Sequence, residues 1–112
     1  MTELPSSLRG RVLVAGAGVS GRGCAAMLAS LGVDTTVADS NETALARVAE
    51  DYGVATVNVD AAAQGEFDLV VTSPGWRPDS PLLVAFHNAG VEVIGDVELA
   101  YRLDRGGVFG PP

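Results

Sequence analysis

Three glycines in the pattern Gly-x-Gly-x-x-Gly are the residues of this sequence best suited to bind a charged ligand. They are Gly16, Gly18 and Gly21, and they directly follow the apolar run 11–15. Between a strand and a helix, the first glycine permits a tight turn, the second lets a phosphate approach the backbone, and the third lets the helix pack on the sheet. The N-terminus of that helix offers free N–H groups to an anion. The pattern predicts a phosphate-binding turn, although a turn without a ligand would use the same glycines.

An acidic residue after the next apolar run is the second candidate. Asp39 lies 18 residues beyond Gly21. In dinucleotide-binding proteins an acid at this place binds ribose hydroxyls. The same carboxylate could instead cap the following helix, a role also open to Ser40 or Asn41. The ribose-binding and capping roles of Asp39 can be held together.

Two later segments complete the set of candidates. Ser73–Trp76 (Ser-Pro-Gly-Trp) follows a third apolar run, and a parallel sheet binds ligands at the carboxyl ends of its strands. This loop could give N–H donors to phosphates or be a simple turn, and Trp76 could stack on a ligand, pack in a lid or cover the loop's own apolar surface. Asp96 and Glu98 stand where another helix is expected to begin, and there they favour the helix dipole.

The elements that would position these residues alternate between strands and helices. Strands are expected at 11–15, 35–38, 55–59, 67–72 and 91–94. Helices are expected at 19–31, from 39–41 to about 52, at 82–89 and at 96–103. The strand at 55–59 is expected at the sheet edge, and 60–65 is expected to be a connection. Such alternation is typical of a parallel sheet covered on both faces. The sequence therefore predicts one Rossmann-like α/β domain with about five strands and four helices.

Composition excludes several kinds of chemistry. The 112 residues include 14 acidic and 7 basic side chains, for a net charge of −7, and every basic residue is Arg. Without Lys there is no P-loop and no Schiff base in this chain, and the acidic balance argues against nucleic acid or an anionic membrane as partners. One cysteine (Cys24) and one histidine (His87) give no internal disulfide and no Cys/His metal cluster, so we expect no metal site and no catalytic residue. The sequence shows neither a bilayer-length apolar stretch nor a signal peptide, so we expect a cytoplasmic protein.

Four segments in this order resemble one family. They are LRGRVLVAGAGVSG at 8–21, VAD at 37–39, VVTSPG at 70–75 and GDVEL at 95–99. Together they resemble the N-terminal domain of the Mur ligases of peptidoglycan synthesis, and among these the member that adds D-glutamate. Residues 1–9 are mostly polar and are expected to form a tail. The resemblance implies a UDP-binding domain at 10–105, and at 106–112 a truncated linker towards an absent central domain on which this domain packs.

The resemblance also implies a substrate and a set of binding residues. The substrate is UDP-MurNAc-L-alanine, whereas ATP and Mg²⁺ belong to the central domain, so this chain alone needs no cofactor and is expected to be inactive. The matching positions are Gly18, Val19 and Ser20 for the diphosphate, Asp39, Ser40 and Asn41 for the uracil, and Gly75 for the loop that closes on the phosphates. Asn41 stands where relatives often carry Arg or Lys. Two other functions would share the glycine turn: an NAD(H)-binding or nucleotide-sensing module, and an interaction domain without a ligand.

Overall fold

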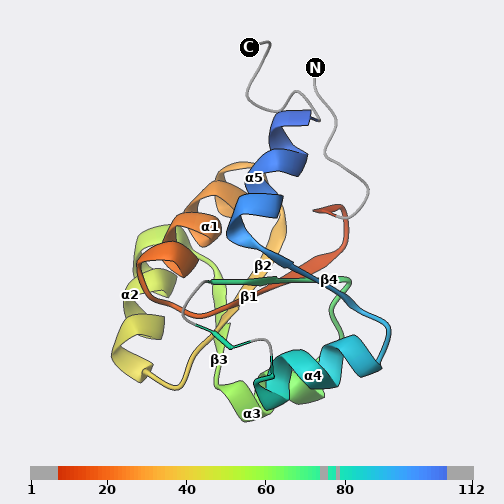
Figure 1. Ribbon diagram of the computed structural model, residues 1–112. Coiled ribbons are helices and arrows are strands. Elements are labelled where there is room, and N and C mark those ends of the chain that lie inside the picture. Colours follow the sequence, from red (N-terminus) through yellow and green to blue (C-terminus); the bar gives the residue numbers. More distant parts are fainter. Residues whose placement is uncertain (1–7, 74–75, 78, 106–112) are drawn as a thin grey trace.

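A five-stranded parallel sheet forms the centre of the molecule (Figure 1). The computed structural model describes residues 8–73, 76–77 and 79–105. The strands are β1 (Arg11–Ala15), β2 (Asp34–Ala38), β3 (Ala55–Val57), β4 (Leu69–Thr72) and β5 (Glu92–Gly95). Their order across the sheet is β3-β2-β1-β4-β5, and every neighbouring pair is parallel. The predicted Rossmann-like α/β fold is confirmed, and β3 lies at the edge as expected.

Helices cover both faces of the sheet (Figure 1). They are α1 (Val19–Ser30), α2 (Glu42–Tyr52), α3 (Val59–Gln64), α4 (Pro81–Asn88) and α5 (Asp96–Arg105). α1, α2 and α5 lie on one face, and α3 and α4 lie on the other. Because successive side chains of a strand point to opposite faces, Val12 and Val14 join one apolar cluster whereas Leu13 and Ala15 join the other. Among the described residues, no helix is long and apolar enough to span a bilayer.

Two expectations from the sequence are wrong in detail. The edge strand stops at Val57, and residues 59–64 form α3, so the described chain has five helices where four were expected. Asn58 caps α3 because its side chain accepts a 2.7 Å hydrogen bond from the Ala61 N–H, and the run of alanines that follows favours a helix. Leu8, expected within a polar tail, is only 1% exposed and packs in the cluster beneath α1 and α5.

The register brings the carboxyl ends of four strands to one edge of the sheet. Ala15 of β1 pairs with Ala38 of β2 and with Thr72 of β4, and Thr72 pairs with Gly95 of β5. The chain leaves β1 towards β2 and β3 on one side, whereas β4 and β5 lie on the other side. The strand order therefore reverses between β1 and β4, which is where open α/β sheets bind their ligands.

Candidate functional site

Glycine is required at two positions of the turn that follows β1. Gly16 has a φ of 110°, which L side chains rarely adopt, and its N–H donates a 2.8 Å hydrogen bond to the Ala38 carbonyl of β2. A Cβ on Gly21 would overlap the carbonyl oxygen of Gly16. The absence of a side chain at Gly21 thus allows α1 to start directly against the turn, as the glycine pattern predicted.

No side chain caps the N-terminus of α1. The N-cap is Gly18, and the first helical hydrogen bond runs from the Arg22 N–H to the Gly18 carbonyl at 2.8 Å. The N–H groups of the intervening first turn have no acceptor within the helix, and α1 has no acidic residue in that turn. A Cβ on Gly18 would meet no atom within 4 Å, and Val19 is 94% exposed. The turn therefore offers uncapped donors and the positive end of a helix dipole at the switch point of the sheet.

Asp39 connects this turn to the loop before α2. One carboxylate oxygen (Oδ2) accepts a 2.8 Å hydrogen bond from the Ala17 N–H, and the other (Oδ1) accepts one of 2.8 Å from the Asn41 N–H. The cap of α2 is Asn41, whose side chain accepts from the Ala44 N–H at 3.1 Å. Asp39 is therefore not the helix cap, and it braces two loops that both belong to the predicted site. Ser40, between them, is exposed.

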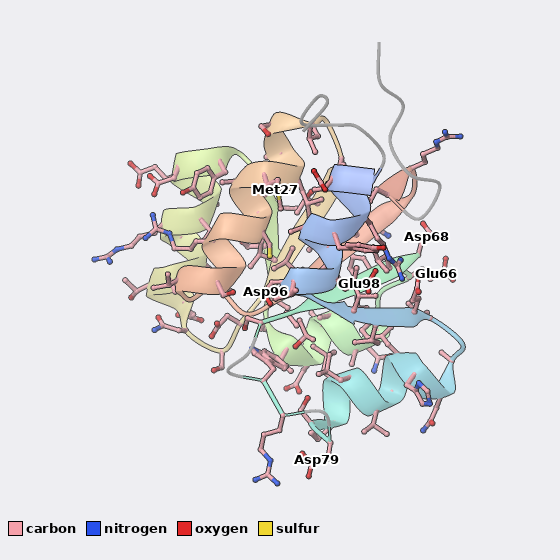
Figure 2. All side chains as sticks on the ribbon, turned by 45° about the horizontal axis from the view of Figure 1, so that its top comes forward. Met27, Glu66, Asp68, Asp79, Asp96 and Glu98 are labelled. Atoms are coloured by element: carbon pink, nitrogen blue, oxygen red, sulfur yellow. The ribbon has the colours of Figure 1, made fainter. Side chains whose placement is uncertain are left out.

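A third segment, at the end of the edge strand β5, reaches the same place. Asp96 is the first residue of α5 (Figure 2). Its carboxylate accepts a 2.6 Å hydrogen bond from the Ser20 hydroxyl of α1. Its other oxygen accepts from the Val97 N–H at 2.9 Å, so the predicted support of the helix start is present as well. The pairing with Ser20 was not predicted. These residues lie 76 positions apart, and only the alignment of β1, β4 and β5 hints that they meet.

The loop after β4 touches the glycine turn. A Cβ on Gly16 would lie 2.7 Å from the Ser73 hydroxyl oxygen and 2.8 Å from Nε1 of Trp76. Trp76 is half-buried against the cluster under α3 and α4, which agrees with the expectation that it covers apolar surface. Gly75, predicted to close on the phosphates, lies outside the described residues.

The titratable groups near the turn are held by neighbours or by the core. Arg22 lies 3.0 Å from the Asp51 carboxylate of α2. Cys24 is buried, and burial together with the charge of Asp96 raises the pKa of its thiol to about 11. His87 is exposed on α4. Within the described part of the chain, no group of three or more His, Cys, Asp or Glu side chains could hold a metal ion.

Comparison with known proteins gives consistent results. Residues 10–95 match the family model of the Mur ligase MurD-like N-terminal domain. The UDP-N-acetylmuramoylalanine–D-glutamate ligase of Corynebacterium efficiens is 58% identical over 112 residues, covering 98% of this chain and 24% of that protein. The ligase of the same name from Corynebacterium diphtheriae is 59% identical over 107 residues, covering 93% of this chain and 22% of that protein. The chain thus spans about a quarter of the length of these relatives.

Solved structures agree on the fold. The UDP-N-acetylmuramate–alanine ligase MurC of Thermotoga maritima superposes with a TM-score of 0.70 at 22% identity, over 86% of this chain and 23% of that chain. Shikimate 5-dehydrogenase of Thermus thermophilus, solved with NADP(H) and shikimate, gives 0.64 at 24% identity, over 94% of this chain and 48% of that chain. At these identities the likeness concerns the fold alone. The family model, the two relatives and the geometry of the glycine turn together show that this chain belongs to the MurD-like family of Mur ligase N-terminal domains.

Proposed function

We propose that this domain binds the UDP part of UDP-MurNAc-L-alanine for a ligase that joins D-glutamate to that substrate. The observation that carries the proposal is the uncapped N-terminus of α1 at the switch point of the sheet. The diphosphate accepts hydrogen bonds from the backbone at Gly18, Val19 and Ser20. The uracil lies against the loop of Asp39, Ser40 and Asn41, which Asp39 ties to the turn.

Backbone groups are the main donors to the diphosphate in this proposal. The chain has a net charge of −7. One terminal nitrogen (Nη2) of Arg22, on the second turn of α1, lies 3.0 Å from Asp51, whereas its buried Nε has no hydrogen-bond partner among the described residues. Free N–H groups and the helix dipole are independent of such ion pairs, so they can hold an anion on an acidic domain. We also assign Gly75 to this site as the residue that closes on the phosphates.

The remaining steps of the reaction are assigned to other parts of the whole ligase. The chain contains no Lys, so it does not fit ATP in the manner of a P-loop. ATP and Mg²⁺ therefore act on a central domain, and the chain is inactive alone. The outer side of α5 supplies a surface for that domain, because Val97 is 79% exposed and Tyr101 is 55% exposed one turn later. We assign the whole enzyme to the cytoplasm.

The alternative function for this domain is binding of NAD(H) at the same turn. It would place a ribose on Asp39, whose two carboxylate oxygens already accept backbone hydrogen bonds. Each oxygen keeps a further lone pair for a hydroxyl, so Asp39 does not separate the two ligands; the match of residues 10–95 to the MurD-like family model is what favours UDP.

An NMR titration of the labelled chain with UDP-MurNAc-L-alanine, and separately with NADH, tests the proposal. Because only part of the full contact set is present, we expect a dissociation constant of about 0.1–1 mM for the UDP ligand. Shifts should be centred on Gly18–Ser20, and NADH should cause none there. Absence of shifts with the UDP ligand, or stronger shifts with NADH, would refute the proposal.

A further inference from the structure

A carboxylate from a different helix lies beside the first turn of α1. α1 has no acidic residue in that turn, yet Asp96 of α5 accepts the hydrogen bond of the Ser20 hydroxyl at 2.6 Å. Figure 2 shows Asp96 at the start of α5, where this helix approaches α1. Both side chains are half-buried. A negative charge is therefore fixed next to the N–H groups to which we assign the diphosphate.

No cation neutralises this charge within the described residues. The ion pairs of α1 and α5 involve Arg22 with Asp51 and Arg102 with Glu92 and Glu98, and none includes Asp96. After burial, the charge of Asp96 is the second cause of the raised pKa of Cys24, which lies one turn beyond Ser20 on α1. A ligand at the first turn of α1 is therefore subject to this charge.

The hydrogen bond also fixes what the Ser20 side chain can do. A hydroxyl has a single proton, and that of Ser20 is donated to Asp96. The oxygen then presents only acceptor lone pairs, which do not attract a phosphate. Binding of an anion is left to the backbone N–H groups.

We propose that Asp96 is a specificity-determining residue that disfavours phosphates with more than one negative charge and so selects an esterified diphosphate over a free one. The inference rests on the proposed function, because it concerns the diphosphate at this turn. In a nucleoside diphosphate ester each phosphate carries one charge. The terminal phosphate of a free nucleoside diphosphate carries nearly two at pH 8, because a phosphate monoester loses its second proton with a pKa near 6.

The size of the effect follows from Coulomb repulsion. A phosphate bound to the Ser20 N–H would lie about 6 Å from the Asp96 carboxylate, given the lengths of the two intervening hydrogen bonds. In partly aqueous surroundings, one further unit of charge at that distance weakens binding roughly 3- to 10-fold. Asp96 therefore favours the ester by about this factor.

The experiment compares two ligands that differ only at the terminal phosphate. The chain is titrated at pH 8 with UDP and with UDP methylated on its β-phosphate, and the ratio of the two dissociation constants is measured by NMR. Asp96→Asn keeps an acceptor for Ser20 but removes the charge, so it should lower the UDP-to-ester ratio roughly 3- to 10-fold. Ser20→Ala keeps the backbone N–H but releases the carboxylate, so it should lower the ratio by a smaller factor.

Glu50→Gln is the matched control. Glu50 is exposed on α2, and its replacement changes the net charge by the same amount, so the ratio should stay that of the wild type. An unchanged ratio in Asp96→Asn, or an equal change in Glu50→Gln, would overturn the inference and leave the proposed function intact. If neither ligand binds the wild type, the proposed function itself fails. If Asp96→Asn does not give the spectrum of a folded protein, the test rests on Ser20→Ala. An unchanged UDP-to-ester ratio of dissociation constants in that variant overturns the inference.

Discussion

The backbone N–H of Ala17 donates a 2.8 Å hydrogen bond to Oδ2 of Asp39, and this bond links the turn after β1 to the loop after β2. The second oxygen accepts from Asn41, so one half-buried carboxylate satisfies two loop N–H groups. Hydrogen bonds between backbone N–H groups and an ionised acceptor are stronger than neutral ones. The shape of the proposed site thus depends on Asp39 whether or not it contacts a ligand.

Asp39→Ala should lower the free energy of unfolding by about 1–3 kcal/mol, because two N–H groups lose their acceptor. Asp39→Asn retains one side-chain oxygen, so its free energy of unfolding should lie between those of Asp39→Ala and the wild type. Urea denaturation followed by circular dichroism measures both. Glu50→Ala, on the exposed side of α2, should change the value by less than about 0.5 kcal/mol. Equal stabilities of Asp39→Ala and the wild type would mean that the two hydrogen bonds to Asp39 contribute nothing to the stability of the fold.

Gly21 and Gly23 form a matched pair on α1. A Cβ on Gly21 would overlap the Gly16 carbonyl, whereas a Cβ on Gly23 would meet no atom within 4 Å. We expect Gly21→Ala to lower the free energy of unfolding by about 3 kcal/mol or more, because the backbone at Gly16 must move to make room. Gly23→Ala should instead stabilise the chain by about 0.5–1 kcal/mol, since alanine is the better helix former. Thermal denaturation compares the stability of the two variants. A lower stability of both would contradict the prediction.

Gly18→Val should abolish binding of UDP-MurNAc-L-alanine while the fold is retained. Gly18 has a φ of −77° and a ψ of −165°, which any residue can adopt, and the space around its Cβ position is open. Two methyl groups there would keep a phosphate away from the backbone. NMR titration measures the loss, and Gly18→Ala should show an intermediate affinity. Wild-type affinity in a folded Gly18→Val variant would place the ligand elsewhere.

Glu92 should make stability depend on pH in the acidic range. Arg102 donates hydrogen bonds of 2.8 and 2.6 Å to its two oxygens, and this contact holds the pKa of the Glu92 carboxyl below its usual 4.5. The charged pair contributes its full stabilisation above pH 4.5 and loses it as the pH falls through the lowered pKa of the folded state. The stability advantage of the wild type over Glu92→Gln should therefore be constant at neutral pH and shrink below pH 4.5. Urea denaturation at several pH values tests this, and an advantage that persists at pH 2 would contradict it.

Cys24 should make stability depend on pH in the alkaline range. Burial and the charge of Asp96 raise the pKa of its thiol from 9.0 to about 11. The unfolded chain loses this proton first, so the free energy of unfolding should fall between pH 9 and 11. Cys24→Ala should remove that part of the pH dependence. Alkylation by iodoacetamide at pH 8 should also be far slower in the folded chain than in urea, because the thiolate is scarce and covered.

The sequence predicts the fold well because its strongest signals are local. Residues 12–15 of β1 form an uninterrupted apolar run, and Gly53 ends α2 with a φ of 69°, so these bounds follow from residue types. The sequence predicts the fourth strand from residue 67, whereas β4 begins at Leu69. α3 was missed because six residues are too few to show a helical period, and its cap at Asn58 reads equally well as the end of a strand.

The sequence predicts where the candidate site lies, but not the contacts between its residues. The glycine turn and the rule on the carboxyl ends of strands locate it. The bonds of Asp39 to Ala17 and of Ser20 to Asp96 join residues 22 and 76 positions apart. Such contacts depend on the strand register and on side-chain conformation, which no local pattern encodes. Asn41, by contrast, was predicted as a possible cap because its position before the helix is a local signal.

The close approach of Trp76 to Gly16 gives the domain a built-in optical signal. It is the single tryptophan of the chain, and its indole lies half-buried against the turn proposed to hold the diphosphate. Intrinsic fluorescence excited at the indole band therefore arises from this one place. A ligand bound at this turn changes the solvation of the ring, so emission intensity and wavelength can be followed through a titration or a stopped-flow experiment without a label. Occupancy of the site and its rate of filling thus become directly observable in the unmodified protein.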